Sequence, residues 1–200
     1  DDIIDIAVDE VEQDFIGLTQ IEDDIFASPK KTISSRLIWL SINLGTAIMA
    51  SYAISFFTEI LDQIIYAAVL MPIVASMGGI AATQTLGIYI RAEALRKLNH
   101  KSKAYLLRRE FIVAVANAIF FSLAIFLITN FWFDNFQLSL AISGAMIINL
   151  LAAAIFGFLV PSLLRKFGYD PAISGGVVIT TVTDILGFVS FLGIIAVLIV

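Results

Sequence analysis

One carboxylate stands alone in a long apolar stretch near the end of the chain. Asp184 is the only ionisable residue deep within residues 177–200, and sixteen apolar or small residues follow it. In a helix, steps of four, four and three residues place Gly176, Thr180, Asp184 and Gly187 on one face. Charged side chains at membrane depth are costly and usually face a protein interior or a wet path. The pattern favours a polar wall along a pathway; an Asp that is hydrogen-bonded to a neighbouring helix, or kept protonated there, is the alternative.

A second stretch interrupts an apolar segment with a proline and two glycines. Pro72 is followed by Ser76, Gly78 and Gly79. Proline removes a helical hydrogen bond, and glycine lets the backbone open or another helix approach. This composition predicts a break whose freed carbonyls suit a hard cation or its water shell, although close helix packing explains the glycines equally well. Further hydrogen-bonding groups follow at Thr83, Gln84 and Thr85.

Five apolar segments are long enough to hold these residues in a bilayer. Of 200 residues, 60% are hydrophobic and 14% are charged, and the mean hydropathy is +0.96. A membrane-spanning helix needs roughly 20 mostly apolar residues. We therefore expect an all-α integral membrane domain rather than a soluble helical protein. The predicted spans are residues 37–57, 64–90, 111–131, 136–160 and 177–200, joined by connections at 58–63, 91–110, 130–135 and 161–176.

The basic residues predict the orientation of these spans. Lys30, Lys31 and Arg36 precede the first span, and the others follow the second or the fourth. Five crossings put all twelve Lys and Arg residues on one side, which the positive-inside rule makes cytoplasmic. We expect a cytoplasmic N-terminus and an external C-terminus in a cell's inner or plasma membrane. Membrane lipid is then a partner, and nucleic acid is not.

The first 29 residues differ in character from the rest. Residues 1–24 hold ten of the seventeen carboxylates, and the chain begins without a Met. We expect a cytoplasmic acidic helix and linker over residues 1–29, a five-helix membrane domain over residues 30–200, and an upstream part that is missing. The acidic face either contacts solvent or holds a hydrated divalent cation. Its members are Asp2, Asp5, Asp9 and Glu12.

The predicted spans contain few side chains that could catalyse a reaction. They contain one deep acid, and the chain has no Cys and a single His, in a basic connection. A lone Asp has neither a second carboxylate nor a base to work with. Movement of a cation is the better interpretation; a Na⁺- or H⁺-coupled transporter and a non-transporting scaffold are the alternatives to a channel.

Two motifs resemble a known family. Residues 71–92, with the core PIVASMGGIAATQTLGIYIRA, resemble the second transmembrane helix of the MgtE family of Mg²⁺ channels. Residues 170–188, DPAISGGVVITTVTDILGF, resemble that family's fifth helix and the loop before it. Many members have Asn and Gly where this chain has Ile80 and Ala81, which removes an amide at this level. Asp184 and Gln84 are retained.

The resemblance implies a homodimer with its pore on the two-fold axis, between the second and fifth helices. It implies that Asp184 faces its dimer mate and holds a largely hydrated Mg²⁺, the transported ion. Backbone carbonyls around Ser76, Gly78 and Gly79, and at Thr180, would complete this metal site. The expected pore lining also includes Gly176, Thr83, Gln84 and Gly187. Upstream cytosolic sensor domains, joined through the acidic helix, would close the pore when Mg²⁺ bridges their acidic surfaces.

Overall fold

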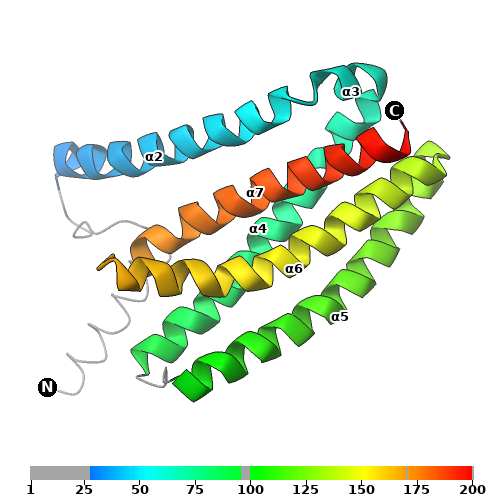
Figure 1. Cartoon of the computed structure of the whole chain (residues 1–200). Helices are drawn as coiled ribbons and strands as arrows, with labels where there is room; N and C mark the ends of the chain where they lie inside the picture. Colours follow the sequence, from blue (N-terminus) through cyan, green and yellow to red (C-terminus); the bar gives the residue numbers. More distant parts are fainter. Residues whose placement is uncertain (1–27, 96–99, 170, 200) are drawn as a thin grey trace, which may run out of the picture.

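The computed structural model describes residues 28–95, 100–169 and 171–199, and these ranges form an all-helical structure. Each of the five long helices contains a segment long and apolar enough to cross a membrane, which confirms the five predicted spans by length and composition (Figure 1). The long helices are α2 (Pro29–Ser55), α4 (Ile65–Ala94), α5 (His100–Phe133), α6 (Phe136–Lys166) and α7 (Pro171–Leu198). The acidic residues Asp2, Asp5, Asp9 and Glu12 lie outside the described residues.

The helices extend beyond the predicted spans, so the connections are shorter than expected. The predicted connection at residues 58–63 is itself a helix, α3 (Thr58–Gln63). Its apolar side chains Ile60 and Leu61 pack against the core, and this burial stabilises a helix of only six residues. Between α5 and α6, only Asp134 and Asn135 remain, and the Asn135 side chain caps α6 by accepting a 2.9 Å hydrogen bond from the Leu138 N–H.

The predicted break in the second span is absent. α4 runs without interruption from Ile65 to Ala94 with Pro72 inside it. Proline removes one helix hydrogen bond, and the turns on both sides of it are held by burial of Leu70, Met71 and Val74. The helix therefore survives because tertiary packing on this face outweighs the loss of a single backbone bond.

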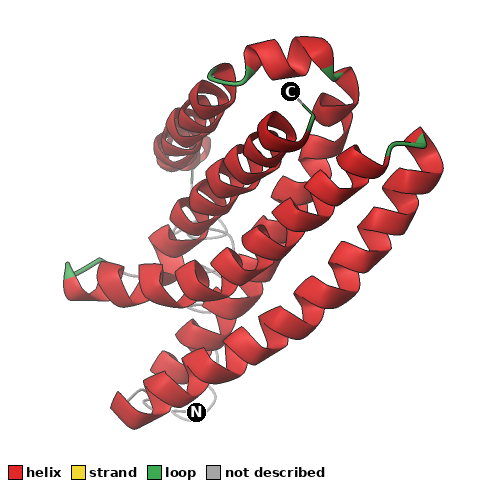
Figure 2. Cartoon of the chain, turned by 45° about the vertical axis from the view of Figure 1, so that its right-hand side comes forward, coloured by secondary structure: helices red, strands yellow, loops and turns green. Residues whose placement is uncertain are grey.

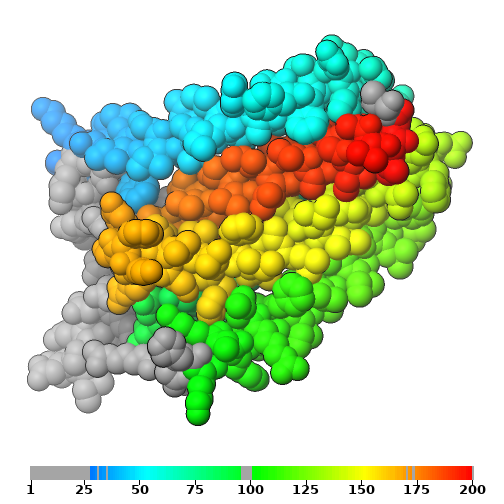
Figure 3. Space-filling model, viewed as in Figure 1, coloured from blue at the N-terminus to red at the C-terminus, as the bar shows by residue number. Residues whose placement is uncertain are grey.

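α6 is the centre of the bundle. It packs against α4, α5 and α7, whereas α2 contacts mainly α7 and stands to one side of the other four (Figure 2). Only 6% of the apolar stretch of α2 is buried, against 44% for α6, so most of α2 is left for contact with lipid or another chain. A view of one face shows α7 between α2 and α6 (Figure 3).

The two ends of the bundle differ in charge. The start of α2, the end of α4, the start of α5 and the end of α6 lie together, at the left of Figure 1, and carry the described basic residues. Here the Arg165 Nε donates to the Glu93 carboxylate at 2.9 Å and ties the end of α6 to the end of α4. The opposite end carries acidic residues of α3 and Asp134. Five alternating helices thus produce the one-sided charge distribution that the sequence predicted.

Candidate functional site

A groove between α4 and α7 brings the two chemically distinctive stretches together. From α4 it is lined by Ser76, Gly79 and Thr83, and from α7 by Thr180 and Asp184. The two helices are in contact here: a Cβ atom added to Gly79 would lie 3.6 Å from the Thr180 Cγ2 atom. The groove has a volume of about 520 Å³ and opens at the surface of the chain. Its remaining lining residues are Pro72, Ala75 and Ile80.

The Asp184 carboxylate opens into this groove. Its side chain is partly exposed, and no described residue donates a hydrogen bond to it or forms an ion pair with it. An ionised carboxylate in such a position keeps its acceptor sites available for water or for a cation. The alternative interpretation, an Asp hydrogen-bonded to a neighbouring helix, does not describe this conformation.

The threonines around Asp184 divide between the groove and the core. The Thr180 hydroxyl lies at the groove and donates to the carbonyl oxygens of Gly176 and Val177, at 2.9 and 3.1 Å. Its proton is therefore engaged, and its remaining lone pairs can only accept. Thr183 is fully buried and donates to the carbonyls of Ile179 and Thr180. Of these two hydroxyls, only that of Thr180 is presented to the groove.

The backbone carbonyls at the site belong to continuous helices. Ser76, Gly78 and Gly79 lie within α4, and Thr180 lies within α7, where carbonyls accept the N–H four residues on. The Thr180 carbonyl additionally accepts from the Thr183 hydroxyl at 3.0 Å. In this conformation the groove offers one carboxylate and several hydroxyls rather than carbonyls freed by a helix break. Such a set suits the water shell of an ion better than its bare surface.

Four predicted site residues lie away from the groove lining. Gly78 and Gly187 face a packed junction: a methyl group on Gly78 would overlap the Asn149 amide, and one on Gly187 would lie 2.8 Å from its Nδ2 atom. Gly176 contributes its carbonyl as an acceptor for Thr180. Gln84 lines a different pocket. On both helices the small residues thus serve packing as well as the groove.

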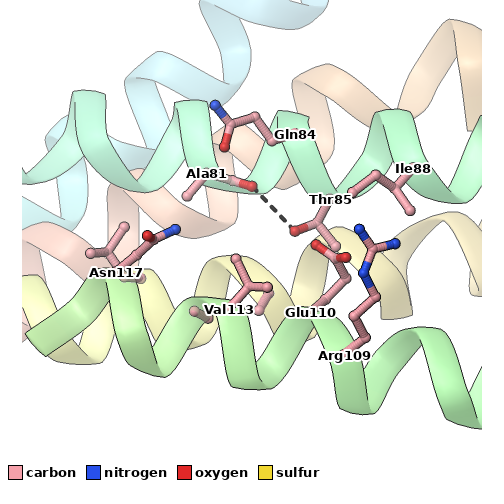
Figure 4. A pocket seen from close by; sticks show the side chains of 11 residues that line it. Ala81, Gln84, Thr85, Ile88, Arg109, Glu110, Val113 and Asn117 are labelled. Carbon is pink, nitrogen blue, oxygen red and sulfur yellow. Dashed lines mark hydrogen bonds between the residues drawn. The ribbon is translucent and has the colours of Figure 1, made fainter.

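The pocket at Gln84 lies between α4, α5 and α6 and has a volume of about 150 Å³ (Figure 4). Thr85 lies there and donates to the Ala81 carbonyl at 3.3 Å. Arg109 and the buried Glu110 approach from α5. It contains both a cationic and an anionic side chain, so it is less suited to a cation than the groove, whose only charged lining residue is Asp184.

Two further residues belong to the surroundings of the site: Asn149 lies behind the groove, and Ile80 lies in its lining. Asn149 forms a hydrogen bond between helices: its Nδ2 atom donates to the Val74 carbonyl at 2.8 Å. Its position behind the groove could not be read from the chain. Ile80, where the resemblance led us to expect Asn, lies in the groove lining and is 54% exposed.

Membrane-length helices that carry a carboxylate into a groove with several hydroxyl groups are typical of membrane transport proteins. The comparison with known families supports this class and narrows it. The chain belongs to the MgtE family, described as divalent cation transporters, whose family profile matches residues 71–194. The match begins one residue before Pro72 and ends beyond Asp184, so it includes the whole lining of the groove. The family is one of transporters and not of enzymes.

Individual relatives match most of the chain. The magnesium transporter MgtE of Bacillus subtilis (strain 168) is 31% identical over 196 residues, which cover 97% of this chain and 44% of the relative. The magnesium transporter MgtE of Enterococcus faecalis is 29% identical over 186 residues, covering 92% and 41%. That of Thermus thermophilus is 25% identical, covering 97% and 44%. The chain therefore spans less than half the length of these relatives.

Proposed function

We propose that this chain forms the ion-conducting membrane part of a divalent-cation channel, and that Mg²⁺ is the transported ion. One observation carries the proposal: Asp184, the acid deep in the last predicted span, lines an α4–α7 groove together with the hydroxyl-bearing residues Ser76, Thr83 and Thr180. The groove lies within the region that matches a family of divalent cation transporters. The relatives named above are magnesium transporters, which favours Mg²⁺ over other divalent cations.

The chemistry of the groove suits a hydrated ion. Mg²⁺ demands octahedral oxygen geometry and gives up its water reluctantly, so a site for it should grip the hydrated ion. The water shell donates outward, and the Asp184 carboxylate and Thr180 hydroxyl can accept from it. Transition metals prefer nitrogen or sulfur donors, which the groove-lining side chains do not offer.

A second copy of the chain would complete the site. Ser76 and Thr83 are exposed at positions within a membrane-length helix, where contact of polar groups with lipid is unfavourable. A homodimer with its two-fold axis along the groove would cover them and place two Asp184 carboxylates around one ion. Their summed charge of −2 would match that of Mg²⁺ and reduce the cost of keeping both ionised.

The orientation follows from the charged ends. The basic end of the bundle is proposed to lie in the cytosol and the acidic end outside, in the inner or plasma membrane. Because the chain spans less than half the length of its relatives, further cytosolic domains ahead of residue 1 are part of the proposal. The acidic stretch at residues 1–17 would connect them to the membrane domain, with Mg²⁺ as a regulatory ligand.

Reconstitution into liposomes tests the proposal. The chain is expected to carry Mg²⁺ into dye-loaded liposomes, and Asp184→Ala is expected to abolish this flux while insertion and dimerisation persist. Undiminished flux in Asp184→Ala would remove the central residue from the mechanism. Absence of flux in the unaltered chain would favour a non-transporting scaffold.

The same liposomes separate a channel from a coupled transporter. A channel conducts Mg²⁺ only down the electrochemical gradient of Mg²⁺. An imposed Na⁺ or proton gradient does not change the rate of this flux. Flux is therefore measured with and without each gradient, with the membrane potential clamped by K⁺ and valinomycin. Mg²⁺ accumulation driven by either gradient would assign the chain to the coupled transporters instead.

A further inference from the structure

Three helices of the bundle meet at a single buried amide. Asn149, in α6, is 0% exposed, and its Nδ2 atom donates to the Val74 carbonyl of α4 at 2.8 Å. Gly78 of α4 and Gly187 of α7 lie against the same amide, and a side chain at either position would collide with it. The two glycines thus make the space that the Asn149 side chain fills.

The Asn149 amide leaves one polar atom buried without a partner in the described part of the chain. The Asn149 Oδ1 atom is buried and has no hydrogen-bond partner among the described residues. A buried acceptor without a donor reduces stability, and a leucine, although somewhat bulkier, has no polar atom to leave unsatisfied. The reason for an amide here is therefore the bond that its other atom makes to α4.

That bond lies directly behind the groove. Val74 precedes the groove residue Ala75, and Gly78 precedes Gly79. On the other helix, Gly187 follows Asp184 by three residues, less than one turn. One side chain therefore touches α4 and α7 at the heights where both line the groove, from the side opposite to it.

We propose that Asn149 is a positioning residue of the cation groove. Its amide holds the Val74 turn of α4 against Gly187 of α7, and so sets the height of the Ser76 hydroxyl relative to the Asp184 carboxylate. The groove depends on this register because its oxygens come from two helices that the chain does not connect directly. The flux test of this inference rests on the proposed function, whereas the disulfide test does not.

A disulfide across the groove measures this register directly. The chain contains no cysteine, so a Gly79→Cys/Thr180→Cys pair is the only thiol pair present. The short distance from a Gly79 Cβ to the Thr180 Cγ2 atom, 3.6 Å, places the two positions within reach of a disulfide. In membranes, oxidation is expected to link this pair readily, and adding Asn149→Leu is expected to slow the linkage at least fivefold. A merely stabilising Asn149 would leave the linkage rate of folded protein unchanged.

Flux in the chain without the cysteines gives the second readout. Asn149→Leu is expected to raise the Mg²⁺ concentration for half-maximal flux at least threefold, with the protein still inserted and dimeric. Should this variant fail to fold, Asn149→Ala with Gly78→Ala removes the same donor while the added methyl group fills part of the vacated space. Unchanged linkage rate and unchanged half-maximal concentration would overturn the proposal. If the unaltered chain carries no Mg²⁺, the proposed function fails, and the linkage rate still decides the role of Asn149.

Discussion

Replacing Asp184 by Asn removes one charge from the groove and little else. The two side chains have nearly the same shape, so the packing of α7 against α4 is preserved. No described residue pairs with the carboxylate, so the substitution leaves no partner unsatisfied within the chain. Any change in transport then reports on the electrostatic interaction between residue 184 and the ion.

The size of the effect follows from the exposure of the site. Two unit charges 4 Å apart attract by about 1 kcal/mol in bulk water and about 4 kcal/mol at an effective dielectric constant of about 20. The charge of Mg²⁺ doubles this attraction, so each carboxylate favours Mg²⁺ over Na⁺ by about 1–4 kcal/mol. Asp184 is partly exposed in an open groove, which selects the lower half of the range. We expect each carboxylate lost in Asp184→Asn to lower the preference for Mg²⁺ over Na⁺ by about 5- to 60-fold, and the two factors multiply in the proposed homodimer.

Competition between the two ions measures this preference. Mg²⁺ uptake into dye-loaded liposomes is followed at increasing external NaCl, with choline chloride keeping the ionic strength constant. Uptake by the unaltered chain is expected to resist Na⁺, whereas uptake by Asp184→Asn falls as Na⁺ rises. Asp62→Asn is the matched control, because Asp62 is an exposed carboxylate of α3 outside the groove lining.

Two results would refute the reasoning. Asp184→Asn with unaltered Mg²⁺ uptake at every NaCl concentration would mean that the charge does not act on the ion. An equal effect of Asp62→Asn would mean that general surface charge, and not the groove, selects the ion.

Three further predictions concern packing, selectivity and regulation. A Cβ atom on Gly157 would lie 2.8 Å from the Ala82 carbonyl oxygen, so Gly157→Val is expected to destabilise the bundle by about 1–3 kcal/mol, seen as a lower unfolding midpoint in detergent. Gly87→Ala, with no atom near the added methyl group, is its control and should not lower that midpoint. Ile80→Asn adds an amide to the groove lining and is expected to lower the Mg²⁺ concentration for half-maximal flux; an unchanged value would separate this position from ion binding. In the full-length protein, deleting residues 1–17 is expected to relieve closure by cytosolic Mg²⁺ without stopping conduction, and loss of all conduction would instead make that stretch part of the pore.

Local composition was sufficient for much of this architecture. Apolar length alone located the five spans, because a lipid environment demands about twenty apolar residues wherever the chain crosses. The basic residues predicted which ends gather together, since alternating helices bring every second connection to the same side. The lone acid, Asp184, was visible because a charge in an apolar run is rare. Each of these signals can be read within one segment of the chain.

Small residues gave an ambiguous signal that the sequence could not resolve. Pro72 with Gly78 and Gly79 fits an opened backbone and fits close packing equally well, and the structure has a continuous α4. The two adjacent glycines have different roles: Gly78 packs against the Asn149 amide, while Gly79 lines the groove. One residue along a helix turns by about 100°, so the role of each depends on the direction from which the neighbouring helix arrives.

The sequence by itself determined the five membrane-length segments, the sidedness of their charge and the acid deep in the last of them, Asp184. Only the tertiary structure decided which polar residues meet: Thr180 and Asp184 with Ser76 across a groove, Gln84 in a separate pocket, and Asn149 at the junction behind. The physical reason is that length and charge act within one segment. A site between helices depends instead on their relative rotation and height, which the packing of the whole bundle sets.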